Sequence, residues 1–260
     1  MPRIVIVAAV AMAAAVAVPS VAHGATVYQD GRTPHRLLLQ AEPGETNLVS
    51  VEGSRAVVIR DDGSPLELAG VPTCMPLDIH AVSCSAVRGI ELDLNDGPDV
   101  AVIATQREVS VEGGAGNDRY VAYATDAPSR VDFDGGIGTD VANYFYATAG
   151  VRVSVDLSAG DGRPGDDDRI RRNVETVLGS AFDDVLAGGP HAEHLAGLDG
   201  DDQITGGAGE DVLSGGSGSD RIDARDGEPD AVDCGGGALD WAAVDIDAEA
   251  SITGCADVVA

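Results

Sequence analysis

Glycine and acidic residues recur at fixed places in the second half of the sequence. The nonapeptide 206–214 is followed by 215–223 in the same pattern, with glycines first, then an acidic residue, then an aliphatic one. A carboxylate supplies hard anionic oxygen, and glycine turns can direct backbone carbonyls inward. Several such oxygens around one ion are the ligands that Ca²⁺ prefers. The spacing therefore indicates calcium binding.

The pattern is most regular over residues 179–223, where five nonapeptides follow one another without insertion. Their sixth position is always acidic and their eighth is always aliphatic. The sixth positions are Asp184, Glu193, Asp202, Asp211 and Asp220. The eighth positions are Leu186, Leu195, Ile204, Leu213 and Ile222.

Looser copies lie on either side of these repeats. Upstream, 113–118 and 135–140 carry the glycine turn and end on Asp118 and Asp140, and 95–99 has a degenerate version of it. Downstream, the segment 226–230 continues the pattern with a one-residue slip and ends on Asp230. We expect the same chemistry at these turns.

Short strands must position these turns. The last three residues of each repeat predict a brief strand whose middle side chain enters a narrow core. A single repeat cannot bury that side chain, whereas stacked repeats can, so the repeats predict a solenoid. Residues 36–40, 48–52 and 55–59 are also predicted to be short strands between turn clusters. We find no persuasive 3.6-residue apolar period in the mature chain, so we expect an all-β protein.

These repeats resemble the hemolysin-type calcium-binding repeats of the RTX family, with the pattern GGxGxDxUx. The resemblance implies a parallel β-roll in which two repeats form one coil and several Ca²⁺ ions lie between turns on the same edge. Asp184, Asp202 and Asp220 would then share one edge, and Glu193, Asp211 and Asp230 the other. The turn at 188–193 departs from the pattern at two positions. The glycines of the candidate turns are Gly197, Gly200, Gly206, Gly209, Gly215 and Gly218.

The charge of the chain agrees with a cation as its partner. The formal net charge is −28, and all 16 basic residues are arginine. Eight of the 44 acidic residues lie in residues 1–90, so the excess charge and the repeats belong to the same part of the chain. This balance argues against nucleic acid as a partner. Stacked carboxylates repel one another until a cation binds, so we expect calcium-coupled folding.

The N-terminus has the features of a Sec-type signal peptide. A basic start at Arg3 is followed by an apolar run from Ile4 to Val18 and by small residues that allow cleavage after Ala22 or Gly24. The run is shorter than the roughly 20 residues that span a bilayer. We therefore expect a secreted protein without a stable membrane span. Its predicted regions are a signal peptide at 1–24, a β-rich region at 25–92, a β-roll at 93–233 and a C-terminal cap at 234–260.

Export changes the interpretation of the four cysteines. Cys74 and Cys84 are ten residues apart, and Cys234 and Cys255 are 21 apart. An even number in an exported chain predicts two disulfides. Three pairings are possible, and we favour the two nearest-neighbour pairs because each brackets a hairpin-sized stretch.

Other chemistry is less well supported by the sequence. The segment His191 to His194 lacks the HExxH spacing of a zinc site, and the acidic run at 199–202 lacks the EF-hand glycine. His35 and His80 stand alone in a region that is small for an enzyme domain. We predict a structural or interaction protein rather than an enzyme. The alternatives are the accessory roll of a secreted enzyme and a calcium-dependent surface adhesin with an extracellular or cell-surface partner.

Overall fold

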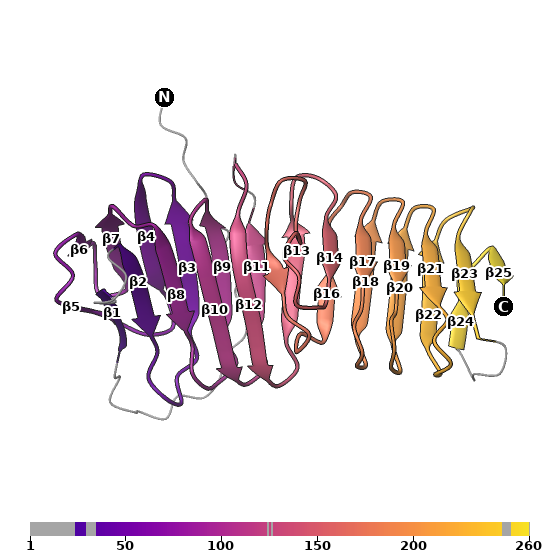
Figure 1. The fold of residues 1–260 in the computed structure, drawn as a ribbon, viewed down its shortest axis with the longest axis horizontal. Helices are drawn as coiled ribbons and strands as arrows, with labels where there is room; N and C mark the ends of the chain where they lie inside the picture. The colour runs from indigo at the N-terminus through magenta and orange to yellow at the C-terminus, as the bar shows by residue number, and fades with distance from the viewer. Residues whose placement is uncertain (1–23, 30–34, 124, 126, 246–250, 260) are drawn as a thin grey trace.

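The protein folds as an elongated solenoid of β-strands. The structure is a computed structural model that describes residues 24–29, 35–123, 125, 127–245 and 251–259. Strands follow one another along the long axis from the N-terminal to the C-terminal end, and the described residues contain no helix (Figure 1). The predicted all-β parallel β-roll is thus confirmed. The predicted signal peptide, up to residue 23, lies outside the described residues.

One sheet runs the length of the described structure, and we call it the long sheet. Its strands are mostly parallel, and most of them belong to different coils. In spatial order its strands are β24 (Ser251–Thr253), β22 (Ala231–Gly236), β20 (Val212–Ser217), β18 (His194–Asp199), β16 (Thr176–Leu178), β13 (Val141–Tyr146), β11 (Arg119–Tyr123), β9 (Val100–Thr105), β3 (Leu48–Gly53), β4 (Ala56–Asp61), β7 (Ala81–Ser85) and β6 (Cys74–Pro76).

Two shorter sheets complete the coils. The N-terminal sheet consists of β15 (Arg169–Ile170), β12 (Arg130–Ile137), β10 (Glu108–Ala115), β8 (Gly89–Asp93), β2 (Arg36–Gln40), β1 (Ala25–Gln29) and β5 (Leu66–Ala69). The C-terminal sheet consists of β14 (Arg152–Ser154), β17 (Val185–Ala187), β19 (Gln203–Thr205), β21 (Arg221–Ala224), β23 (Trp241–Val244) and β25 (Asp257–Val259).

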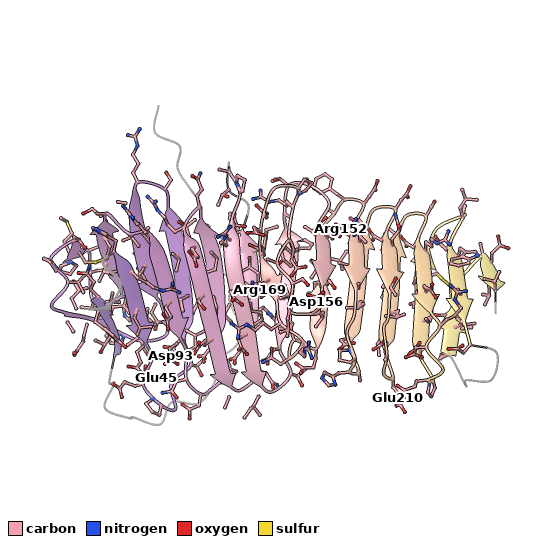
Figure 2. The ribbon with its side chains drawn as sticks, in the orientation of Figure 1. Glu45, Asp93, Arg152, Asp156, Arg169 and Glu210 are labelled. Carbon is pink, nitrogen blue, oxygen red and sulfur yellow. A yellow bond between two sulfur atoms is a disulfide. The ribbon has the colours of Figure 1, made fainter. Side chains whose placement is uncertain are left out.

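The chain passes from the N-terminal to the C-terminal sheet within residues 147–172. This segment contains β14 of the C-terminal sheet and β15 of the N-terminal sheet. Arg152, Asp156 and Arg169 mark it near the middle of the solenoid (Figure 2). The two shorter sheets therefore meet at this segment.

The strand register sets the length of a coil. Val185 of β17 pairs with Gln203 of β19, and His194 of β18 pairs with Val212 of β20. Each pair is 18 residues apart, so two nonapeptides form one coil, as the resemblance implied. Adjacent repeats therefore lie in different sheets, and alternate repeats lie side by side in the same sheet.

The core is narrow where the repeats are regular. Each three-residue strand there buries its middle side chain, and the eighth-position residues Leu195 and Leu213 are 0% exposed. Alternate side chains of a strand point to opposite faces, so the neighbours of these residues point away from the core. The N-terminal coils have longer strands, and β10 buries both Val109 and Val111. The core is therefore thicker at the N-terminal end.

Antiparallel strands occur at the N-terminal end of the solenoid. β3, β4, β7 and β6 form consecutive antiparallel pairs in the long sheet, and β1 is antiparallel to β2. Such pairs cover the first coil, whose strands would otherwise present an open edge. The disulfide between Cys74 and Cys84 joins β6 to β7.

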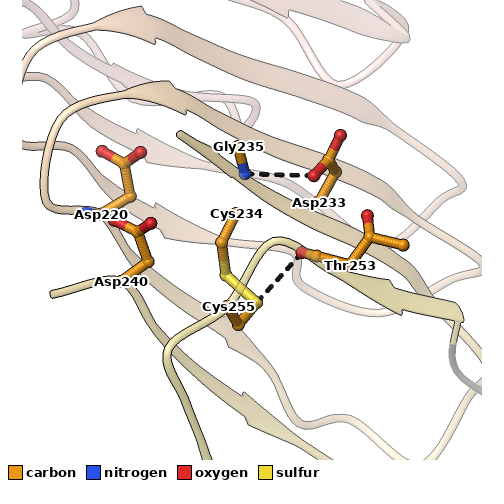
Figure 3. Close-up of a disulfide and its surroundings, with 7 residues drawn as sticks. All are labelled: Asp220, Asp233, Cys234, Gly235, Asp240, Thr253 and Cys255. Atoms are coloured by element: carbon orange, nitrogen blue, oxygen red, sulfur yellow. Dashed lines mark hydrogen bonds between the residues drawn. A yellow bond between two sulfur atoms is a disulfide. The ribbon is translucent and has the colours of Figure 1, made fainter. Parts of the chain in front are cut away.

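The second disulfide joins Cys234 of β22 to Cys255, between β24 and β25 (Figure 3). It ties the last described coil to the one before it. The structure thus contains both nearest-neighbour pairings that the sequence favoured, and no described cysteine is free.

The sheets continue across the region boundaries predicted from the sequence. β2 and β3, in the region 25–92, pair in parallel with β8 and with β9. β22 crosses residue 233, and β23 to β25 extend the same sheets beyond it. The described strands therefore share one stacked arrangement from residue 36 to residue 259.

Candidate metal sites

The acidic sixth positions form two rows along the turns, each directly before a strand. The C-terminal ladder precedes the strands of the C-terminal sheet, and the long ladder precedes those of the long sheet. The C-terminal ladder consists of Asp184, Asp202, Asp220 and Asp240. The long ladder consists of Asp99, Asp118, Asp140, Glu175, Glu193, Asp211 and Asp230.

Within each ladder, most neighbouring acidic residues are joined by a hydrogen bond from the backbone N–H of one to the carboxylate of the next. The backbone N–H of Asp184 donates to Oδ1 of Asp202 at 2.8 Å, and the N–H of Asp202 donates to Oδ1 of Asp220 at 2.9 Å. On the other edge, the N–H of Asp211 donates to Oδ1 of Asp230 at 2.9 Å. The structure therefore places Asp211 and Asp220, which belong to adjacent repeats, in different ladders.

The upstream turns belong to the long ladder. The N–H of Asp99 donates to Oδ1 of Asp118 at 2.9 Å, and that of Asp118 donates to Oδ1 of Asp140 at 2.8 Å. The N–H of Asp140 donates to a carboxylate oxygen of Glu175 at 2.7 Å, across 35 residues of sequence. The turns at 113–118 and 135–140 thus occupy positions equivalent to those of the regular repeats.

The second oxygen of most ladder aspartates is buried and unpaired. Oδ1 accepts a backbone N–H, whereas Oδ2 has no hydrogen-bond partner among the described residues, although it is shielded from solvent. A buried carboxylate oxygen without a donor is costly unless a cation approaches it. These oxygens belong to Asp99, Asp118, Asp140, Asp202, Asp211, Asp220, Asp230 and Asp240.

Backbone carbonyl oxygens lie near these unpaired carboxylate oxygens. A Cβ atom placed on Gly197 would lie 2.0 Å from Oδ2 of Asp202 and 2.8 Å from the carbonyl oxygen of Gly215. At Gly215 the corresponding position lies 2.4 Å from Oδ2 of Asp220 and 2.6 Å from the carbonyl oxygen of Cys234. Carboxylate and carbonyl oxygens thus converge, which is the ligand chemistry of Ca²⁺. Figure 3 shows the carboxylates of Asp220 and Asp240 next to each other in this row.

The other candidate glycines allow the turns to stack closely. A side chain at Gly206 would meet Oδ2 of Asp211. Gly200, Gly209 and Gly218 have positive φ angles of 126°, 129° and 143°, and side chains there would overlap the backbone one coil back. Glycine is needed at these positions for geometry.

We call the acidic residues of each ladder its rungs. At two rungs, both carboxylate oxygens accept hydrogen bonds from the protein itself. The carboxylate of Asp184 accepts hydrogen bonds from the N–H and the hydroxyl of Ser180 and from the N–H of Val151. The carboxylate of Glu193 accepts from the N–H groups of Gly189 and His191 in its own turn. The departure of the turn at 188–193 from the repeat pattern thus has a structural counterpart, since Glu193 points back into its own turn.

Burial raises the pKa values of several ladder aspartates, five of which shift strongly. Burial is the main cause, and it raises the pKa of Asp99 and of Asp202 to about 7. It raises the pKa of Asp140, Asp211 and Asp230 to about 6. Neighbouring carboxylates add a smaller upward effect on the pKa, as those one coil away do for Asp202. A bound divalent cation would oppose both effects, because it stabilises the charged form.

Sequence reasoning missed two rungs, Glu175 and Asp240, and undervalued a third, Asp99. The segment 235–243 is a nonapeptide with Asp240 at its sixth position and Ala242, which is 0% exposed, at its eighth. Its extra glycine and its offset of 20 residues from Asp220 conceal the repeat. Asp99, in the degenerate turn at 95–99, also lies in register with Asp118.

A family model for the RTX calcium-binding nonapeptide repeat matches residues 173–204 and 187–222, with four copies. This chain carries RTX calcium-binding nonapeptide repeats. The RTX match includes the ladder residues from Glu175 to Asp220, and the rungs at Asp118, Asp140, Asp230 and Asp240 lie outside it. No curated protein matches the chain.

The RTX architecture explains why the candidate sites contain few side chains. Among the described residues, no three His, Cys, Asp or Glu side chains form a metal-binding cluster. The structure thus does not bring His191, Glu193 and His194 together as a cluster of this kind. The RTX turns would supply calcium with backbone carbonyls in addition to carboxylates. Within the described ranges, no helix is long and apolar enough to cross a membrane.

Proposed function

We propose that the protein is a secreted calcium-binding repeat protein whose folding is coupled to extracellular calcium. The observation that carries the proposal is the row of buried, unpaired Oδ2 atoms that face backbone carbonyls. Each such oxygen lowers stability in the absence of a cation and binds one when it is present. Extracellular calcium-binding modules have affinities of roughly 10⁻⁴ to 10⁻³ M.

Three groups of rungs are the proposed ligands for several Ca²⁺ ions. Each group combines neighbouring carboxylates with the carbonyls of their glycine turns. The groups are Asp99, Asp118 and Asp140; Asp202, Asp220 and Asp240; and Asp211 and Asp230. We assign Asp184 a supporting role at the end of its ladder, since its carboxylate already has donors.

Two further features support secretion. Both disulfides join described residues, and stable disulfides are typical of oxidising compartments. The segment 1–24 has the composition of a cleaved signal peptide. The proposed protein therefore meets calcium at these concentrations only after export.

N-terminal sequencing of the secreted form tests the proposed export. Cleavage after Ala22 leaves a mature chain that begins at His23, and cleavage after Gly24 leaves one that begins at Ala25. A chain from the medium that still begins at Met1 would contradict a cleaved signal peptide.

We further propose that the protein is not an enzyme. His80 is one of two isolated histidines in the N-terminal region, and its Nδ1 lies 2.9 Å and 3.1 Å from the carbonyl oxygens of Asp61 and Ser64. The ring thus holds a turn together, which is a structural role. A structural or interaction role therefore accounts for the described residues with the fewest assumptions.

Calcium titration of the metal-free full chain tests the proposal. We expect binding of several ions by calorimetry, together with a gain of β-sheet signal in circular dichroism and a higher melting temperature. An unchanged spectrum and an unchanged melting temperature on addition of CaCl₂ would contradict calcium-coupled folding.

Two matched variants locate the sites. Asp202→Asn removes a charge from an unpaired oxygen, so it should reduce the number of bound ions without lowering metal-free stability. Asp184→Asn places an amide nitrogen against the donors of Ser180 or Val151, so it should cost about 1–3 kcal/mol with or without calcium. If the two variants behaved alike, the assignment of these two roles would be wrong.

A further inference from the structure

The long ladder continues beyond Asp99 toward the N-terminal end of the solenoid. Asn47 comes directly before β3, and the parallel register of β3 with β9 places it beside Asp99. Its backbone N–H donates to Oδ1 of Asp99 at 2.6 Å, which is the hydrogen bond that joins Asp99 to Asp118 in the ladder. Asn47 therefore occupies a ladder position with a neutral amide in place of a carboxylate.

The side-chain amide of Asn47 has a defined orientation. Its Nδ2 donates to Oδ1 of Asp99 at 3.2 Å, and the reversed orientation would place two acceptor oxygens together. Oδ1 of Asn47 is therefore turned away from that oxygen of Asp99. Asn47 is 0% exposed, and its Oδ1 has no hydrogen-bond partner among the described residues.

Asp61, the last residue of β4, lies on the other side of Asn47. In the long sheet β3 lies between β9 and β4, and β3 and β4 are antiparallel. Oδ1 of Asp61 accepts three backbone N–H groups, which belong to Leu48, Gly63 and Ser64. Oδ2 of Asp61 is buried and has no hydrogen-bond partner among the described residues. Asp61 thus resembles the ladder aspartates, with one bonded oxygen and one unpaired oxygen.

No basic side chain neutralises this buried carboxylate. None of the ion pairs among the described residues includes Asp61. His80 lies close by, but its Nδ1 contacts the carbonyl oxygens of Asp61 and Ser64 rather than the carboxylate. Burial raises the pKa of Asp61, which shows the cost of its charge. A buried charge of this kind lowers stability until a cation approaches it.

A backbone carbonyl lies beside the same groups. A Cβ atom placed on Gly63 would lie 2.2 Å from the carbonyl oxygen of Thr46, 3.1 Å from Cα of Asn47 and 3.2 Å from Oδ1 of Asp61. These three groups therefore lie around one small region. Glu45, in the same turn, is partly exposed at the edge of the solenoid (Figure 2). Carboxylate, amide and backbone carbonyl oxygens are all ligands of Ca²⁺.

We propose that a Ca²⁺ ion binds between Asp61 and Asn47, outside the RTX nonapeptides, with Oδ2 of Asp61 and Oδ1 of Asn47 as ligands. The carbonyl oxygen of Thr46 and water would complete the site. Because Asn47 precedes β3 and Asp61 ends β4, the ion would join the antiparallel strands of the N-terminal end to the long ladder. The proposal rests on the proposed function only for the identity of the ion, because none of these residues belongs to the repeats.

Calcium binding by the full chain and two variants tests the proposal. Asp61→Asn removes the charge but keeps an oxygen for the three N–H donors. Asn47→Ala removes the neutral ligand and leaves Asp61 and its donors unaltered, so it decides the test if Asp61→Asn does not fold. Equilibrium dialysis at saturating CaCl₂ should show one ion fewer per chain in each variant. Asp220→Asn, which alters a rung within the repeats, is the matched comparison.

Hydrogen exchange locates the lost ion. With Ca²⁺ at about tenfold excess over the Kd of this site, the amides of residues 46–49 and 61–64 should exchange roughly tenfold more slowly than in metal-free protein. Both Asp61→Asn and Asn47→Ala should abolish this slowing, whereas Asp220→Asn should retain it.

Melting temperatures separate an ion ligand from a purely structural residue. Asp61→Asn should melt at or above the temperature of the unaltered chain without metal, because it removes an uncompensated buried charge, and below it in CaCl₂. An equal loss in both conditions would overturn the proposal, and so would an unchanged number of bound ions. If only Asp220→Asn lost an ion, this site alone would be wrong. If the unaltered chain bound no calcium, the proposed function would fail with it.

Discussion

The two halves of the solenoid reach similar coils by different means. In the N-terminal half, β10 and β12 are eight residues long and each buries at least two large or branched apolar side chains. In the repeat half, the three-residue strands β17 and β19 bury one side chain each. Burial of apolar surface is the main source of folding free energy. The repeat half therefore has less of it and depends more on its carboxylate ladders.

Removal of calcium should separate the two halves most clearly. In metal-free protein, we expect amide hydrogens of residues 185–244 to exchange much faster, while those of β8 and β10 remain protected. At a roughly 100-fold excess of Ca²⁺ over its Kd, one site contributes about 2.7 kcal/mol. Hydrogen-exchange mass spectrometry with and without CaCl₂ measures this. Uniform loss of protection would show that the halves fold as one unit.

Matched core truncations should differ in their calcium dependence. Leu213→Ala in the repeat half and Leu92→Ala in the N-terminal half each remove a side chain that is 0% exposed. Each should cost about 2–5 kcal/mol. We expect only Leu213→Ala to raise the calcium concentration needed for half-maximal β-sheet signal. In this variant, calcium binding must offset the folding stability that the substitution removes. Equal shifts in the two titrations would contradict the comparison.

The C-terminal disulfide should matter more in metal-free protein. Cys234→Ser/Cys255→Ser opens a loop across 21 residues and should cost about 2–4 kcal/mol. Because the adjoining rungs Asp220 and Asp240 repel each other without a cation, we expect the larger drop in melting temperature without calcium. Calorimetry of the double variant in CaCl₂ and after metal removal provides the measurement. A larger drop in CaCl₂ would argue against this coupling.

The pH dependence of metal-free protein should be the smallest effect. Burial raises the pKa of Asp202 to about 7 and that of Asp230 to about 6, from 3.8. The folded state therefore holds protons more tightly, and the stability that these groups contribute is full below pH 3.8 and is lost as the pH rises toward 7.

We expect the metal-free melting temperature to fall by roughly 2–4 °C between about pH 5 and pH 8. The fall is small because turns that lack calcium can open locally and let water reach the charged oxygens. Melting curves across this pH range provide the measurement, and saturating calcium should remove the fall. A rise with pH in metal-free protein would contradict the burial of these groups.

Much of the candidate site could be predicted because it is periodic. The RTX resemblance implies two repeats to a coil, and with that the nine-residue spacing predicts the edge on which Asp202 or Asp211 lies. The eighth-position aliphatic residues and the nearest-neighbour disulfides were predicted for similarly local reasons. Asp240 was missed because an extra glycine and a longer coil disguise its repeat.

What the sequence determined by itself is the chemistry of each turn, since glycine, carboxylate and aliphatic side chain act within nine residues. Tertiary structure alone decided which carboxylate oxygens are left without a donor. Asp184 and Asp202 have the same place in the repeat, yet Ser180 and Val151 satisfy the first, whereas Oδ2 of the second is unpaired. The difference depends on which backbone groups the coils bring together, across separations such as the 33 residues between Val151 and Asp184.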